Sequence, residues 1–139
     1  MYVDNELIFE EGWDLGTSAT TDYASGCINL GAAARDVGKG RPMYAVIVVS
    51  EAFSPSSTSG TVTFSLVEES DTTIDGSSVV LSTTEAFTDS GLTLGHAPIV
   101  IPVPPGVALQ YLGLKVTWTQ DLSSGKVDAF LTLDPQTNP

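Results

Sequence analysis

The sequence has few of the side chains from which catalytic and metal sites are usually built. Its 139 residues include one cysteine, Cys27, and one histidine, His96. A lone cysteine excludes an intramolecular disulfide, and one Cys with one His cannot supply the three or four ligands of a typical zinc site. The chain has no GxSxG motif, and Cys27 is far from His96 in the sequence, so no nucleophile–base pair is indicated. The sequence therefore predicts no catalytic residues, no metal and no cofactor.

Positive charge is also scarce, which excludes several kinds of partner. Five Lys and Arg stand against seventeen Asp and Glu, and the formal net charge is −12. Binding to phosphates draws its affinity from many Lys and Arg contacts, so we expect no nucleic-acid partner. The same charge disfavours an anionic membrane surface, and no stretch approaches the roughly 18 apolar residues of a membrane span. The N-terminus has no basic region of a signal peptide, so we expect a protein made in a cytoplasm.

Most of the positive charge is concentrated in one glycine-rich loop. Arg35, Lys39 and Arg41 lie within "LGAAARDVGKGRPMY", residues 30–44. The loop is not a P-loop, because a glycine follows Lys39 where Ser or Thr is required. Two interpretations remain open. The three cations face carboxylates of a partner, or Arg35 pairs with Asp36 or another local acid and the loop only turns the chain.

Apolar residues alternate with polar ones along several segments, which is typical of β-strands with one buried face. Residues 43–50 are apolar on both faces and suit a central strand, whereas the prolines of residues 98–105 suit an edge strand. Spacers rich in Ser, Thr, Asp, Gly and Pro separate these segments, and no helical period is present. The sequence therefore predicts an all-β sandwich or barrel. The predicted strands are residues 27–30, 43–50, 61–67, 78–83, 98–103, 111–119 and 126–133.

A group of acids follows one of these strands. Glu68, Glu69, Asp71 and Asp75 provide clustered oxygens, but they lack the spacing and the glycine of a calcium-binding EF-hand loop. We therefore expect a solvated acidic turn here.

The first 26 residues differ from the rest of the chain. They mix aromatic residues, Tyr2, Phe9 and Trp13 among them, with acids, and they show no sustained period. We therefore divide the chain into an N-terminal arm or extension, residues 1–26, and one β-sandwich domain, residues 27–139. The arm either lies over the sandwich and buries Phe9 and Trp13 in it, or reaches a neighbouring subunit with these aromatics as anchors.

As a whole, the chain resembles a family of viral structural proteins. The resemblance is carried by "MYVDNELIFEEG" at the start, by "INLGAAARDVGKGRPMYAVIVV", by "TVTFSLVEESD", by "IPVPPGVALQYLGLKVTWT" and by "GKVDAFLTLD" near the end. Residues 28–49 are the most distinctive part. These segments resemble the tailed-phage capsid cement, or decoration, proteins of the small jelly-roll type.

The resemblance implies a fold and a function. The fold is an antiparallel, jelly-roll-like β-sandwich of about eight strands with an N-terminal arm. The protein is expected to be no enzyme but a structural virion protein, synthesised in the host cytoplasm and placed on the exterior of the mature capsid. There it bridges neighbouring major capsid proteins and stabilises the shell, associating as a homo-oligomer, with a dimer favoured over a trimer. The candidate capsid or subunit interface comprises Arg35, Asp36, Lys39, Arg41, Tyr2, Phe9 and Trp13.

Two other function classes compete with this interpretation. Jelly rolls also serve as lectins, so a carbohydrate-binding module, displayed on the virion or host-derived, is the main alternative. It requires exposed aromatics, and Tyr111 and Phe130 fall on the expected solvent faces of their strands. A small β-barrel enzyme is disfavoured because the chain has so few acid–base groups besides carboxylates.

Overall fold

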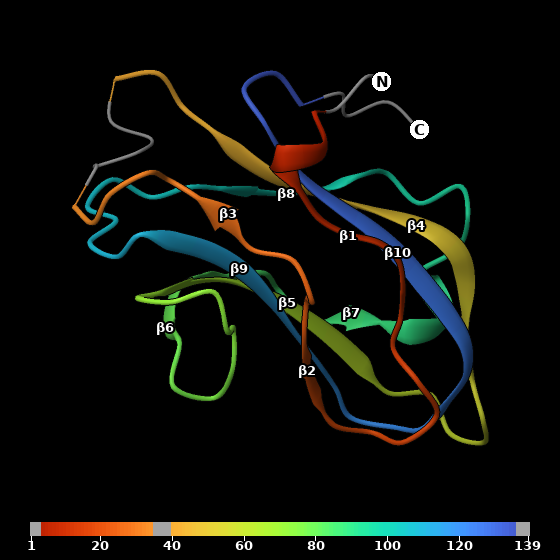
Figure 1. Cartoon of the computed structure of the whole chain (residues 1–139). Coiled ribbons are helices and arrows are strands. Elements are labelled where there is room, and N and C mark those ends of the chain that lie inside the picture. The colour runs from red at the N-terminus through yellow and green to blue at the C-terminus, as the bar shows by residue number, and fades with distance from the viewer. Residues whose placement is uncertain (1–3, 35–39, 136–139) are drawn as a thin grey trace.

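The computed structural model describes residues 4–34 and 40–135, which form two facing antiparallel sheets (Figure 1). Sheet A has the order β1 (Ile8–Asp14), β10 (Leu122–Thr132), β4 (Tyr44–Pro55) and β8 (Ile99–Pro102). Sheet B has the order β2 (Thr21–Tyr23), β9 (Tyr111–Trp118), β5 (Thr61–Glu69) and β6 (Val79–Thr83), with β3 (Ile28–Asn29) on β9 and β7 (Phe87–Thr88) on β5. Two 3-10 turns, η1 (Asn5–Leu7) and η2 (Asp89–Gly91), complete the elements. The expected all-β sandwich is confirmed.

The strand order is that of a jelly roll. β2 and β3 pair with the same edge of β9, and β6 and β7 pair with the same edge of β5, so each pair is one interrupted strand. The ten segments then count as eight strands, in the order 1-8-3-6 in sheet A and 2-7-4-5 in sheet B. This is the double-sheet arrangement of the jelly roll, which avoids most exposed edges by folding the two sheets onto each other. The expectation of about eight strands is confirmed in this sense.

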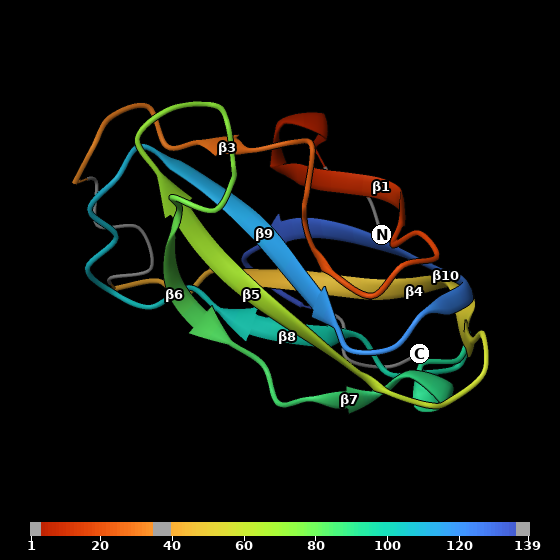
Figure 2. The same ribbon diagram turned by 90° about the horizontal axis from the view of Figure 1, so that it is seen from below.

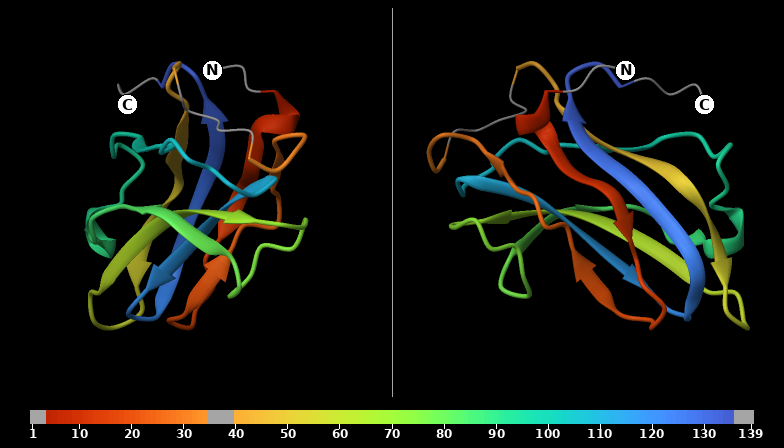
Figure 3. Two further views of the ribbon diagram at one scale, coloured as in Figure 1. Left: turned by 90° about the vertical axis from the view of Figure 1, so that its left-hand side faces the viewer. Right: turned by 45° about the vertical axis from the view of Figure 1, so that its right-hand side comes forward.

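The period-two pattern of the sequence is clearest in β9, whereas β5 is buried on both faces from Phe64 to Glu69. In β9, Leu112, Leu114 and Val116 are fully buried, while Lys115 and Thr117 between them point outward and are half-buried. β4 lies between β10 and β8 as a central strand, and the proline-flanked β8 lies at the edge of sheet A, both as predicted. The core fills the space between the two layers. Figure 2 shows the two layers from the side of sheet B, and Figure 3 shows them from two further sides.

The predicted boundary at residue 26 is wrong, because the described part of residues 1–26 is built into both sheets. β1 pairs with β10 in sheet A, and β2 pairs with β9 in sheet B. Phe9 and Trp13 are buried, with 2% and 5% of their surface exposed. The pairing of β1 is shifted twice, between Ile8 and Glu10 and again before Trp13. Such bulges reset the alternation of faces, which is why no period was visible in this segment.

The acidic segment at the end of β5 is only in part the solvated turn that the sequence suggested, because Glu68 and Glu69 are the last residues of the strand. Asp71 and Asp75 are exposed, but Glu68 and Glu69 are buried. Glu68 accepts hydrogen bonds from the backbone N–H groups of Ala108 and Leu109, at 2.9 and 3.1 Å. Buried carboxylates require such donors, because an unpaired buried charge is strongly unfavourable. These two acids therefore hold loops in place rather than binding solvent.

Residues 70–78 fold back over the outer face of sheet B. Ile74 of this loop is buried against Gly113 of β9, where an added Cβ would approach the Ile74 side chain to 2.6 Å. The buried Glu69 holds the loop, since it accepts hydrogen bonds from Ser70, Ser77 and Ser78. One end of sheet B is thus covered by this chain's own loop.

Candidate functional site

Of the predicted interface residues, the structure describes Arg41, Phe9 and Trp13. Arg41 is exposed just before β4. Arg35, Asp36, Lys39 and Tyr2 lie outside the described residues. Phe9 and Trp13 belong to the core of this chain, so they are buried in the sandwich and do not anchor a neighbouring subunit. In addition, Nε1 of Trp13 donates a hydrogen bond to Oδ2 of Asp22 at 3.0 Å, which ties β1 to β2.

Among the described cations, Arg41 differs from Lys126 in having no acid beside it. Nζ of Lys126 lies 3.9 Å from Asp14 and 3.6 Å from Glu51, so its charge is balanced within sheet A. Arg41 makes no ion pair with any acid of the described part of the chain. Lys115, the third described cation, makes no ion pair with a described acid either, so the two interpretations of the loop are not distinguished at Arg41.

The outer face of sheet A has an apolar row that crosses all four strands. Ile8 is paired with Phe130, Phe130 with Val46, and Val46 with Val100, so these side chains share one face. Val46 is fully buried although it does not belong to the core between the sheets, because its neighbours in the row cover it. In the sequence, this outer apolar face was indicated by residues 43–50, which are apolar on both faces of the predicted strand. The other three side chains of the row, Ile8, Val100 and Phe130, are half-buried.

The two aromatics of the carbohydrate hypothesis lie on different sheets. Phe130 is in the apolar row of sheet A, whereas Tyr111 belongs to β9 of sheet B. Both are half-buried. They therefore cannot form a common stacking platform for a sugar.

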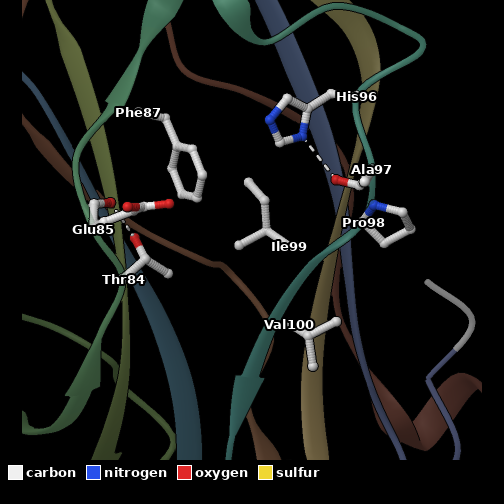
Figure 4. Close-up of a pocket in the computed structure, with 8 residues that line it drawn as sticks. All are labelled: Thr84, Glu85, Phe87, His96, Ala97, Pro98, Ile99 and Val100. Atoms are coloured by element: carbon white, nitrogen blue, oxygen red, sulfur yellow. Dashed lines mark hydrogen bonds between the residues drawn. The ribbon is translucent and has the colours of Figure 1, made fainter. Parts of the chain in front are cut away.

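A pocket of about 420 Å³ opens where an edge of sheet A meets an edge of sheet B. One wall comes from the segment between β6 and β7 and from Phe87 of β7, and the other comes from β8 and the residues before it (Figure 4). The rings of Phe87 and His96 meet edge to face, with centroids 5.6 Å apart. The pocket is lined by Thr84, Glu85, Phe87, His96, Ala97, Pro98, Ile99 and Val100.

Neither the histidine nor the cysteine is placed for nucleophilic chemistry. Nδ1 of His96 donates a hydrogen bond to the carbonyl oxygen of Ala97 at 2.7 Å, and no Ser, Thr or Cys hydrogen-bonds to its ring among the described residues. Burial raises the pKa of the Cys27 thiol, and the nearby charge of Asp71 raises this pKa further. A thiol with a raised pKa is mostly protonated at neutral pH and is therefore a poor nucleophile.

The described residues contain neither a metal-binding cluster nor a membrane-spanning helix. No group of three or more His, Cys, Asp or Glu side chains in residues 4–34 and 40–135 is arranged to hold a metal ion. Within the same residues, no helix has the length and apolar character needed to cross a membrane.

The strand order and the burial pattern define a jelly-roll β-sandwich protein. A family model described as Bbp16 matches residues 15–131, and the chain therefore belongs to the Bbp16 family. The match begins directly after β1, although β1 is a full member of sheet A. A search of the curated proteins finds no match to this sequence.

Proposed function

We propose that the protein is a structural virion protein that binds the outer surface of an assembled phage capsid. In this role it bridges neighbouring major capsid proteins and stabilises the shell. It acts as a homo-oligomer, with a dimer favoured over a trimer, and needs no cofactor. It is synthesised in the host cytoplasm and resides on the exterior of the mature virion.

The observation that carries the proposal is the strand order, taken with the placement of Tyr111 and Phe130 on different sheets, which removes the sugar platform that a lectin would need. The resemblance to capsid cement proteins implied a jelly roll specifically, whereas the alternating pattern alone allowed any sandwich or barrel. The observed order 1-8-3-6 and 2-7-4-5 is the one that the resemblance required. The surface also supports the proposal, because the exposed Arg41 is a feature suited to contact with a partner protein. Many weak contacts of this kind, repeated over a closed shell, stabilise it by mass action.

The proposal predicts that the protein is found on mature capsids in near-stoichiometric amounts. Capsids purified from infected cells are compared with immature shells from the same cells by quantitative mass spectrometry. We expect the protein on the mature particles and its absence from the immature ones, since a decoration protein binds the expanded shell. If the protein stays in the soluble fraction under conditions that keep the virion intact, the proposal is wrong.

Reversing the charge of the glycine-rich loop should weaken capsid binding while leaving the fold intact. The triple variant Arg35→Glu, Lys39→Glu, Arg41→Glu is added to undecorated capsids, and the bound fraction is measured by sedimentation. We expect at least a tenfold loss of affinity, because three attractive contacts become repulsive. Arg41→Glu is compared with Lys115→Glu, which changes the net charge equally at a half-buried site on sheet B. Equal effects of these two single variants would argue against a specific role of the loop.

A further inference from the structure

The pocket between the sheet edges combines an apolar floor with two groups that accept hydrogen bonds. Phe87 and Ile99 form the floor, and Pro98, just before β8, and Val100 of β8 extend it. Figure 4 shows Glu85 entering from the β6–β7 side, with His96 on the opposite wall. The two sides belong to different sheets, so the shape of the pocket depends on the complete sandwich.

The carboxylate of Glu85 has no hydrogen-bond or ion-pair partner among the described residues. The hydroxyl of Thr84 donates a hydrogen bond to the backbone carbonyl of Glu85 at 2.8 Å, and it therefore does not bond to the carboxylate of Glu85. A carboxylate accepts hydrogen bonds and carries a negative charge, so this wall attracts a cation.

His96 contributes a second acceptor. Because the carbonyl oxygen of Ala97 can only accept, Nδ1 carries the hydrogen of their 2.7 Å bond. In the neutral ring, Nε2 is then left as an acceptor, and Figure 4 shows this nitrogen on the side of the ring toward Phe87. The edge-to-face contact with Phe87 holds the ring in this orientation.

A ligand that complements these walls has a cationic head with several N–H donors on an apolar stem. Lysine and arginine side chains have this composition, since their methylene stems cover apolar surface while the charged head finds polar partners. The ring of Phe87 in the lining adds a cation–π contribution. The net charge of −12 further favours a basic ligand over an acidic one.

We propose that this pocket binds a lysine or arginine side chain presented by a partner protein. The ligand class follows from the pocket itself, and the inference rests on the proposed function only in taking the major capsid protein as the partner. Glu85 pairs with the cationic head, His96 accepts one of its N–H groups, and Phe87 and Ile99 contact the stem. The pocket is thus a second, acidic contact site that complements the basic loop around Arg41.

The test uses single amino acid derivatives as probes of the full chain. The isotopically labelled protein is titrated with Nα-acetyl-lysine amide and Nα-acetyl-arginine amide, and amide shifts are followed by NMR. The neutral counterparts, Nε-acetylated lysine amide and citrulline amide, match the probes in size and lack the charge. We expect saturable shifts centred on residues 84–87 and 96–100, millimolar affinity for the cationic probes, and at least tenfold weaker binding of the neutral ones.

Glu85→Gln should weaken the binding of the lysine probe by roughly tenfold, because a charge-assisted contact becomes neutral. Glu11→Gln is the matched control, since Glu11 is an exposed acid on β1, at the opposite edge of sheet A from β8. Because Glu85 is exposed, its replacement should leave the thermal unfolding midpoint unchanged.

Three outcomes would overturn the proposal: equal binding of neutral and cationic probes, equal affinity of Glu85→Gln and wild type, or shifts spread evenly over all exposed acids. The binding of Glu85→Gln to undecorated capsids is measured separately, by the sedimentation assay described for the loop variant. Loss of probe binding with unchanged capsid binding supports the pocket as a cation site and assigns its partner to a protein other than the capsid.

Discussion

Replacing Phe9 with alanine is expected to destabilise the isolated protein severely. Phe9 is 2% exposed and belongs to the core, while β1 around it forms one edge of sheet A. Truncating a buried phenylalanine costs about 3–5 kcal/mol, because transfer free energy is lost and a cavity remains. The total stability of a domain this size is about 5–15 kcal/mol, so a large part of it is lost. Urea unfolding followed by tryptophan fluorescence measures the change.

The matched control for this experiment is Leu94→Ala. Leu94 is 65% exposed, so its truncation should change the free energy of unfolding by less than about 0.5 kcal/mol. A Phe9→Ala protein that unfolds like wild type but fails to bind capsids would restore the interpretation of residues 1–26 as an arm. The opposite result, unfolding at much lower urea, is what burial of Phe9 requires.

The strands in which polar and apolar residues alternate regularly could be predicted from the sequence. The positions of two other strands within their sheet could be predicted as well. Residues 61–67 and 111–119 contain enough polar–apolar alternation to fix both the element and the buried face. The double-sided apolar pattern of residues 43–50 indicated a central strand, and the prolines of residues 98–105 indicated an edge. In each case the signal is local, because solvent contact and proline geometry act on single residues.

Features that depend on distant pairing could not be predicted in the same way. The bulges of β1 arise from its register with β10, and they erased the period that would have revealed the strand. The burial of Glu68 depends on backbone donors forty residues away, at Ala108 and Leu109. The pocket is assembled from two sheet edges, so Glu85 and His96 have no spacing in the sequence that relates them. The jelly-roll order itself followed from the resemblance, not from periodicity.

Replacing Asp89 with alanine should cost about 3 kcal/mol, because several donors lose a buried charged acceptor at once. Asp89 is 1% exposed at the start of η2. It accepts hydrogen bonds from the hydroxyl of Ser59 at 2.6 Å, from the N–H of Gly60 at 2.7 Å and from the N–H of Ser90 at 2.6 Å. These bonds fix the loop between β4 and β5 against η2. Chemical unfolding of Asp89→Ala at pH 7 measures the loss of unfolding free energy. A loss below about 0.5 kcal/mol would contradict the proposed role of these hydrogen bonds in stability.

The same hydrogen bonds to Asp89 predict that the stability of the protein depends on pH. Burial alone would raise the pKa of Asp89, but the hydrogen bonds from Ser59, Gly60 and Ser90 outweigh burial and lower this pKa below its ordinary value of 3.8. The folded protein thus binds this proton more weakly than the unfolded chain. The stabilisation by Asp89 is therefore complete above about pH 5 and is lost as the pH falls through the lowered pKa.

Other carboxylates also titrate in this range, so the informative quantity is the difference in unfolding free energy between wild type and Asp89→Asn. This difference should be constant between pH 7 and 5 and should shrink toward pH 2.5, because the amide cannot gain a proton there. A difference that stays constant down to pH 2.5 would show that the negative charge of Asp89 does not contribute to stability.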